Sequence, residues 1–260
     1  MMTLRRQRGY TMIEITVALF IGLFLLAGLF TILQNTRRTS TTQTGLTKLQ
    51  DEERMAMSLL NDVIQNAGYF DANKYQTALT AWPAAVTVAG PAGQPLTLAA
   101  GQPLTGTHTS AGAADVLVAR YSTAGGDGVI NCIGATSTVA ADWVNAFYVS
   151  STTTSGVTTY ELNCTPDGTT ASGVPLVTDV ANLQAWYGIS TQSGVSNVDT
   201  YRTADQMGAA DWANVTSVRV TLTFANPLYS ASQPAQQPQY VYFTRVIALQ
   251  GRTGVVANAL

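Results

Sequence analysis

The hydrophobic pattern divides the chain into a long helical part and a part with a shorter period that follows it. From Ile15 to Leu33 about 19 consecutive residues are apolar or small and none is charged, close to the roughly 20 residues that a helix needs to cross a bilayer. Further along, the apolar positions recur at helical spacing and form one face: Leu46, Leu49, Ala56, Leu59, Leu60, Val63, Ile64 and Ala67. No proline precedes Pro83, and Gly68 is a helix-stop signal. We therefore predict a helix over Thr11–Ala67, apolar all round in its first half and amphipathic in its second.

From Tyr69 onward, short β-like runs are bounded by Gly, Pro, Asn and Ser. The predicted strands are Ala114–Tyr121, Ala146–Ser150, Val157–Leu162, Leu183–Ile189, Val215–Phe224 and Tyr240–Leu249. Two segments, Ala84–Gly112 and Gln192–Gly208, are predicted to be long loops, and Gln233–Gln239 a linker between strands. Strands that follow one long helix predict an α+β fold, in which a long N-terminal spine helix packs on an antiparallel β-sheet domain.

Composition narrows the class of protein. The 260 residues are 46% hydrophobic and only 11% charged, and Thr, Ser, Gly, Ala and Gln dominate after the apolar run. This balance is typical of an extracytoplasmic β-rich domain. The formal net charge is −2, so no basic field favours duplex nucleic acid as a partner.

The two cysteines, Cys132 and Cys164, lie in the polar part of the chain. In an exported domain such a pair indicates one disulfide, which would stabilise the fold by roughly 3–4 kcal/mol. The alternative is two unpaired buried thiols.

The N-terminus carries the strongest functional signal. Arg5, Arg6 and Arg8 precede the apolar run, which places the N-terminus in the cytoplasm and the bulk of the chain outside. The run continues into Gln34 and Asn35 without the small-x-small site of an ordinary signal peptide, and an uncleaved anchor remains open. Neither alternative explains Glu14, because a carboxylate at the head of a membrane-spanning run is costly without a partner.

The string Arg8-Gly9-Tyr10-Thr11-Met12-Ile13-Glu14 resembles the class III signal of type IV prepilins. That signal is a short basic leader, a glycine, an aromatic residue, and a glutamate four residues after the aromatic one. Tyr10 and Met12 depart mildly from the commoner Phe and Leu.

The resemblance implies that a prepilin peptidase cuts between Gly9 and Tyr10 and methylates the new amino terminus at Tyr10. It also implies that Glu14 pairs with the N-terminal amine of a neighbouring subunit, which agrees with the need of a carboxylate in an apolar surrounding for an opposite charge. The expected parts are a cleaved leader (1–9), a transmembrane or filament-core helix (10–33), an amphipathic second half of the spine (34–68) and a periplasmic β-rich domain (69–260).

A second resemblance, to minor pilins of the PilW type, covers most of the chain. The strings that carry it are Ile64–Tyr69, Val180–Gly188, Tyr201–Ala204, Asp211–Val220 and Phe243–Leu249. At the end of the last string, Gln250-Gly251 stands where Arg-Asn is expected. Individually the strings are weak, and it is their order and spacing that indicate the family.

This resemblance implies a low-copy subunit that helps to prime type IV pilus assembly and lies near the pilus tip, supporting motility, adhesion or DNA uptake. The implied partners are other minor pilins, the major pilin, the prepilin peptidase, the inner-membrane assembly machinery and the membrane itself, with no specific nucleic acid. The subunit would wait in the bacterial inner membrane and then move to the surface pilus. A J-type pseudopilin of a type II secretion system is the main alternative, and a membrane-tethered periplasmic enzyme a remote one.

Candidate chemistry is sparse. The only histidine, His108, lies among Gly, Thr and Ser and is expected to be a loop residue, and no sequence motif for a catalytic site, a metal or a cofactor is present. Loop acids could hold calcium, but their spacing matches no EF-hand, so we expect solvated or capping roles: Asp127, Asp199, Asp205 and Asp211. Four aromatic residues are expected in the core, and three arginines in structural pairing: Trp143, Trp186, Tyr187 and Trp212, and Arg202, Arg219 and Arg245.

Overall fold

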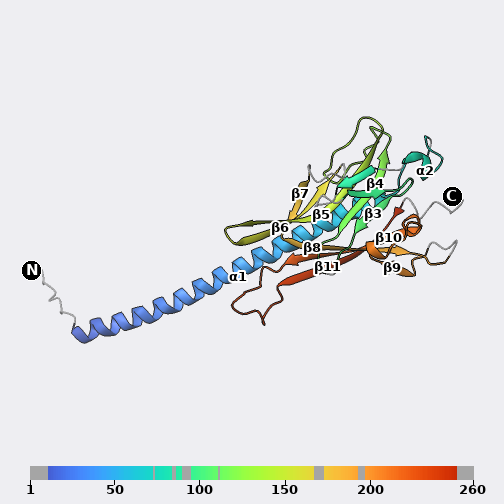
Figure 1. The fold of residues 1–260 in the computed structure, drawn as a ribbon. Coiled ribbons are helices and arrows are strands. Elements are labelled where there is room, and N and C mark those ends of the chain that lie inside the picture. Colours follow the sequence, from blue (N-terminus) through green and yellow to red (C-terminus); the bar gives the residue numbers. More distant parts are fainter. Residues whose placement is uncertain are drawn as a thin grey trace, which may run out of the picture. The chain divides into compact units, whose positions relative to one another are not determined.

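The computed structural model describes residues 11–72, 74–83, 86–89, 95–110, 112–166, 173–192 and 197–250 (Figure 1). The chain forms two compact units, Met1–Lys48 and Leu49–Leu260. Helix α1 (Met12–Asn66) contributes to both units. Each unit is described separately below.

Helix α1 begins and ends within one residue of the predicted Thr11–Ala67. In the second unit its apolar face is buried, as the spacing predicts: Leu49, Ala56, Met57, Leu60, Val63 and Ile64. Gly68 has a φ of +90°, a left-handed conformation that glycine adopts without strain, and its N–H bonds the carbonyl of Arg120. This geometry turns the chain out of the helix and alongside strand β4 (Val116–Thr123).

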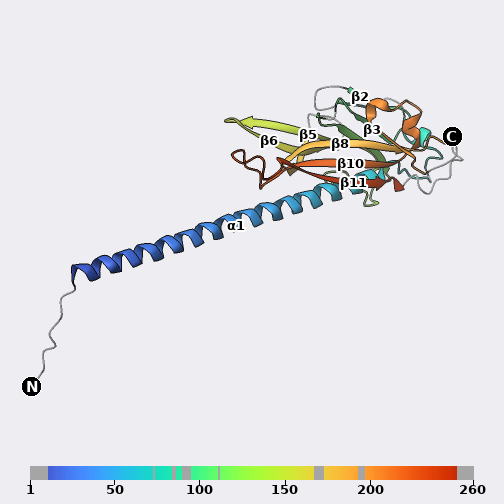
Figure 2. The same cartoon turned by 90° about the horizontal axis from the view of Figure 1, so that it is seen from below.

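Two large antiparallel sheets and one two-stranded sheet follow the helix, where the sequence predicted one sheet (Figure 2). The five-stranded sheet has the order β3-β4-β5-β6-β7, with the bounds Leu104–Thr107, Val116–Thr123, Ala141–Thr154, Val157–Thr165 and Val174–Thr178. The four-stranded sheet has the order β11-β10-β8-β9, with the bounds Tyr240–Ala248, Val215–Ala225, Val180–Ile189 and Thr200–Arg202. One long helix combined with antiparallel sheets confirms the α+β class.

One core joins the second half of α1 to both sheets. Alternation along β10 buries Val218, Val220, Leu222 and Phe224, as their period of two predicts. Leu60, Leu117 and Leu183 from the helix and the two sheets belong to the same cluster and have no exposed surface. Each such leucine contributes roughly 1.5–3 kcal/mol when it leaves water, so this shared core is the main stabilising element of the second unit.

The predicted loop over Ala84–Gly112 is wrong in three places. It contains strand β3 and a hairpin of β1 (Val86–Ala89) and β2 (Pro95–Leu98), and a short helix, α2 (Ala78–Ala81), precedes it. Leu98 is fully buried in a second, smaller cluster on the five-stranded sheet, with Val116, Val118, Val144, Ala146 and Tyr148. Four-residue strands among glycines and prolines are too short to show a period, and it is this tertiary burial that selects them.

The predicted loop over Gln192–Gly208 is wrong as well. Strand β9 pairs with β8, and two 3-10 helices follow it, η2 (Ala204–Gln206) and η3 (Asp211–Asn214). With three residues, β9 is too short for a periodic signal.

A buried arginine organises one end of the five-stranded sheet. Arg120 in β4 has no exposed surface, and its Nη2 donates to the carbonyls of Ala99 at 2.9 Å and Gln102 at 2.8 Å. Its Cζ lies 5.2 Å from the ring centroid of Trp82. Burial lowers the pKa of Arg120 to about 10, and the charge of Asp142 opposes this shift. The guanidinium therefore stays charged at neutral pH and fixes segment 99–102 against β4.

A polar contact that the sequence did not predict joins the two sheets. Asp115, at the start of β4, accepts a hydrogen bond from the Ala185 N–H of β8 at 2.9 Å and lies 2.9 Å from Nδ1 of His108. Burial raises the pKa of the Asp115 carboxyl, while these two hydrogen bonds act to lower it. His108 does lie in a loop, after β3, and its partner there is a buried carboxylate.

The sheets also approach closely at Gly106 in β3. A Cβ at this position would lie 2.1 Å from Oη of Tyr187 in β8 and 2.5 Å from the carbonyl oxygen of Val116. Tyr187 is buried, and burial raises the pKa of its hydroxyl. A glycine is therefore required where the two sheets meet.

We predict that Gly106→Ala destabilises the domain by about 2–3 kcal/mol, because the added methyl group forces Tyr187 or strand β4 to move. Urea unfolding of the full chain in detergent, followed by Trp fluorescence, measures the effect. Gly112→Ala is the matched control, since a Cβ there meets no atom within 4 Å. Equal unfolding midpoints for the two variants would contradict the close approach.

Candidate assembly site at the start of the helix

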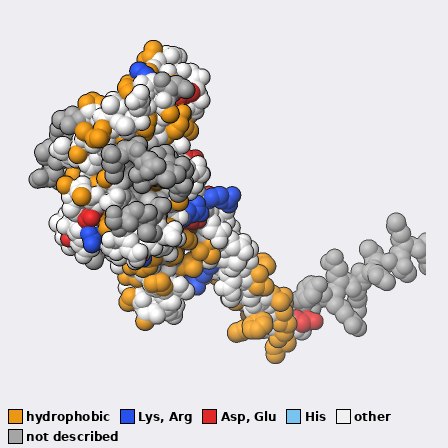
Figure 3. Space-filling view, turned by 90° about the vertical axis from the view of Figure 1, so that its right-hand side faces the viewer, with side chains coloured by type: hydrophobic (Ala, Val, Ile, Leu, Met, Phe, Trp, Pro, Cys, Tyr) orange, Lys and Arg blue, Asp and Glu red, His pale blue; other side chains and the backbone are white. Residues whose placement is uncertain are grey.

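The first half of α1 presents apolar side chains to its surroundings on every side. From Met12 to Leu33 the large hydrophobic residues are exposed, with Phe24 at 81%. Figure 3 shows hydrophobic side chains, in orange, covering the start of this helix. By length and composition α1 is able to cross a membrane. An apolar surface of this extent in water is unfavourable, so it requires lipid or other apolar helices around it.

Glu14 lies in the first turn of this apolar helix. Its Oε2 accepts hydrogen bonds from the backbone N–H and the hydroxyl of Thr11, each at 3.2 Å. Thr11 thus occupies the N-cap position and Glu14 the third helical position, the arrangement of one half of a capping box. Among the described residues, which begin at Thr11, no cation pairs with Glu14. The carboxylate is held by its own helix.

The sequence itself contains a signal for this cap. Thr11-Met12-Ile13-Glu14 fits the Thr-x-x-Glu pattern that marks helix starts before apolar runs. The leader arginines Arg5, Arg6 and Arg8 and the residues of the predicted cut, Gly9 and Tyr10, lie outside the described residues.

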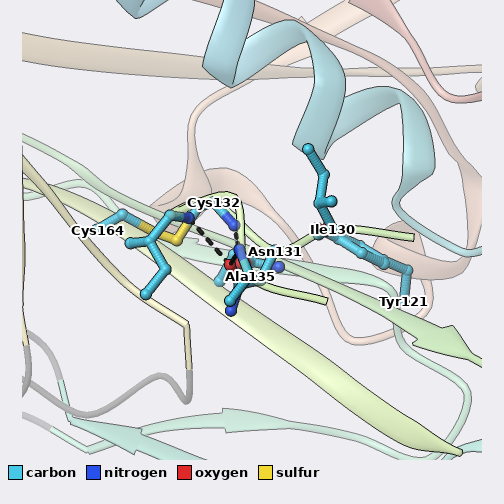
Figure 4. Close-up of a disulfide and its surroundings, with 8 residues drawn as sticks. Tyr121, Ile130, Asn131, Cys132, Ala135 and Cys164 are labelled. Carbon is cyan, nitrogen blue, oxygen red and sulfur yellow. Dashed lines mark hydrogen bonds between the residues drawn. A yellow bond between two sulfur atoms is a disulfide. The ribbon is translucent and has the colours of Figure 1, made fainter. Parts of the chain in front are cut away.

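The disulfide predicted from composition is present between Cys132 and Cys164, 32 residues apart (Figure 4). Cys164 lies in β6, and Cys132 lies in the loop between β4 and β5. Hydrogen bonds hold this loop independently of the sulfur atoms: the Cys132 N–H donates to Oδ1 of Asn145 at 2.8 Å, and the Tyr121 hydroxyl donates to the Ile130 carbonyl at 2.7 Å. The disulfide therefore fastens an already ordered loop to the sheet.

The loop acids have the capping roles expected of them. Asp127 accepts from the Ala124 N–H at 2.8 Å and from the Thr123 hydroxyl, and the latter bond is the main cause of the lowered pKa of Asp127. The Thr191 N–H likewise lowers the pKa of Asp199. Over the described ranges, no group of three or more His, Cys, Asp and Glu side chains is placed to hold a metal ion.

Two other loop acids also stabilise local structure. Asp205 accepts a hydrogen bond from the Thr203 hydroxyl, and Asp211 forms an ion pair with Arg202 at 2.7 Å. The second contact confirms structural pairing for one of the three arginines. Both acids lie at the 3-10 helices that follow β9.

The prediction of core positions for the four aromatic residues is correct for Tyr187 and incomplete for the others. Trp143 and Trp212 are partly buried at the edge of the core, and the ring of Trp212 contacts Tyr187 with centroids 4.7 Å apart. Trp186 lies on the opposite face of β8, with Arg219 over its ring. Alternation along β8 explains the difference, because neighbouring residues of a strand point to opposite faces.

Comparison with known families agrees with both parts of this description. Residues 4–30 match the model of the prokaryotic N-terminal methylation motif, and residues 146–251 match that of PilW, type IV pilus-assembly protein W. No curated protein and no solved structure gives a significant match. The first match contains Glu14 and the apolar half of α1, and the second contains the whole four-stranded sheet. These two matches together support the identification of the chain as a type IV pilus minor pilin with a prepilin signal.

Proposed function

We propose that this minor pilin is a low-copy subunit that joins other minor pilins, primes polymerisation of the pilus and lies near its tip. The observation that carries the proposal is that one chain combines an exposed apolar helix, which begins with Glu14 in its first turn, and a domain that matches PilW. The helix supplies what insertion into a filament core requires. The domain, with two sheets and a disulfide, is larger than a small major pilin needs, which favours a specialised position over bulk polymer.

The proposed path begins in the inner membrane. The arginines of the leader stay on the cytoplasmic side, the helix spans the bilayer and the domain folds in the periplasm. The disulfide supports this orientation, because disulfides persist in oxidising compartments. Prepilin peptidase then cuts after Gly9, and Tyr10 becomes the methylated amino terminus.

Two opposite charges at the start of the helix would direct the assembly of subunits. Cleavage creates a cationic amine at Tyr10, and Glu14 has a carboxylate without a cationic partner in the described chain. A charge in an apolar filament core is strongly disfavoured when its oppositely charged partner is missing. Pairing of Glu14 with the amine of a neighbouring subunit therefore sets the register of one helix against the next.

Deletion of the gene tests the pilus role. We expect loss of sheared surface pili and unchanged secretion of extracellular enzymes, because the subunit acts in pilus assembly and not in secretion. Restoration by the wild-type gene on a plasmid is the control. Normal pili with blocked secretion would instead identify a pseudopilin of a type II secretion system.

Gly9→Ala is expected to block processing, because it adds a methyl group to the residue on the N-terminal side of the scissile bond. On a high-resolution blot the variant should run about one kilodalton heavier than the processed wild-type subunit, because it keeps its leader. Its assembly into sheared pili should fall at least tenfold. Wild-type length and assembly of this variant would remove the cleavage assignment. Gly112→Ala is the control: it lies in the β-rich domain, outside the apolar helix, and a Cβ there meets no atom within 4 Å.

Glu14→Gln is expected to leave processing and membrane insertion intact while it abolishes assembly, because the amide oxygen keeps the hydrogen bonds of Thr11 and only the charge is lost. Glu14→Ala, which removes both, should behave in the same way. The subunit recovered in sheared pili is measured against total membrane-bound subunit. Normal assembly of Glu14→Gln together with failure of Glu14→Ala would show that the helix cap, rather than the ion pair, is required.

A further inference from the structure

The outer face of the four-stranded sheet is open to solvent. We call it the open face; on each strand its residues alternate with those that point into the core: Gln184 and Trp186 in β8, Tyr201 in β9, Arg219 and Thr221 in β10, and Tyr242, Thr244 and Val246 in β11. Tyr242 is 66% exposed and Val246 is 55% exposed. The outer face of the other sheet differs, because Leu98 of the β1–β2 hairpin is buried against it.

Arg219 lies in an aromatic clamp at the centre of the open face. Its Cζ is 4.6 Å from the ring centroid of Trp186 and 4.9 Å from that of Tyr201. The three side chains come from three adjacent strands, β10, β8 and β9. Two ring contacts restrict the rotamers of a side chain that would otherwise be mobile.

The strands are shaped to build this clamp. Gly188 lies opposite Tyr201 in the register, and a Cβ on Gly188 would be 2.9 Å from Cε1 of Tyr201 and 2.4 Å from Oγ of Ser217. The Tyr201 hydroxyl lies 3.1 Å from the same Oγ. The glycine thus lets the ring lie across β8, and the serine holds its far end.

The charge of Arg219 has no counterpart in the described residues. No hydrogen-bond acceptor and no carboxylate contacts its guanidinium there, in contrast to Arg120, which donates to carbonyls, and Arg202, which pairs with Asp211. A stacked guanidinium keeps its N–H groups in the plane of the fork, where a carboxylate binds through two parallel hydrogen bonds. The side chain is therefore ordered in advance for an anion that the domain does not supply.

The surroundings of Arg219 restrict the chemistry of that anion. The other residues of the open face are uncharged threonine, glutamine, valine and aromatic side chains. Binding of a nucleic acid relies on many cations that neutralise successive phosphates, and one arginine on a domain with a net negative charge does not provide them. Protein interfaces, by contrast, concentrate their binding energy in a few Arg, Trp and Tyr side chains with neutral residues around them.

We propose that the open face docks another subunit of the pilus, and that an Asp or Glu side chain of that subunit is received by Arg219 between Trp186 and Tyr201. The inference rests on the proposed function, which supplies the class of partner. It adds the surface, the residue at its centre and the charge that the partner presents. The three clamp side chains, and Gly188 beneath them, lie within the strings that carry the resemblance to PilW.

The test is photo-crosslinking in piliated cells with the full chain carrying p-benzoylphenylalanine in place of Tyr242. We expect a crosslink to another chain with an N-terminal methylation motif, through a surface that includes an Asp or Glu. Arg219→Met should reduce the yield at least tenfold, because it keeps an unbranched apolar side chain and removes the charge. Arg245→Met is the matched control: it changes an exposed arginine of β11 whose register partner, Val220, is buried on the core face, and its yield should stay within twofold of wild type.

Charge reversal separates docking from a purely structural stack. Arg219→Glu should abolish the crosslink, and replacement of the partner's acidic residue by Lys should restore it. Thermal unfolding of each variant shows that the domain still folds. The proposal is overturned by full crosslinking of Arg219→Met, by loss without rescue in the charge-reversed pair, by a crosslink to nucleic acid or glycan, or by no crosslink in cells with normal pili. Failure of the proposed function is distinct, because it would appear as normal pili in the deletion strain.

Discussion

The apolar stripe of α1 at Ala56, Leu60 and Ile64 packs against both sheets in one core, and the arrangement of the second unit depends on this contact. These residues have no exposed surface, and the inward residues of β4, β8 and β10 belong to the same cluster. The burial is nondirectional, so it does not by itself fix how the sheets are placed. Directional contacts do so: Asp115 links the start of β4 to β8, and Gly106 lets β3 approach Tyr187.

Buried charges follow a consistent rule in this domain. Arg120 donates to backbone carbonyls and Asp115 accepts from a backbone N–H and lies beside His108, so each buried charge has a polar partner at hydrogen-bond distance. Unpaired, either would cost several kcal/mol. Both link segments that are distant in sequence, and they give the packing a specificity that apolar contacts lack. Arg219 departs from the rule at the surface, where its partners are two rings.

Periodicity made the long elements predictable and left the short ones hidden. Helix α1 and strand β10 repeat their pattern often enough to be identified, and both were found nearly to the residue. Strands of three or four residues, such as β2 and β9, contain no repeat, and burial against another strand selects them. The candidate assembly site was predictable because Glu14 is an anomaly in an apolar run. The pairing of His108 with Asp115 was not, because only the folded sheets bring Asp115 beside β8.

The cap at the start of α1 has a consequence for maturation. The groups that satisfy the first turn, the N–H and hydroxyl of Thr11 and the carboxylate of Glu14, all lie on the filament side of Gly9. Removal of a leader that ends at Gly9 takes away none of them. The proposed cut after Gly9 therefore leaves in place the groups that cap the helix. Under this proposal the cut changes only the charge and length of the segment that precedes the helix, which makes it a chemical signal rather than a conformational one.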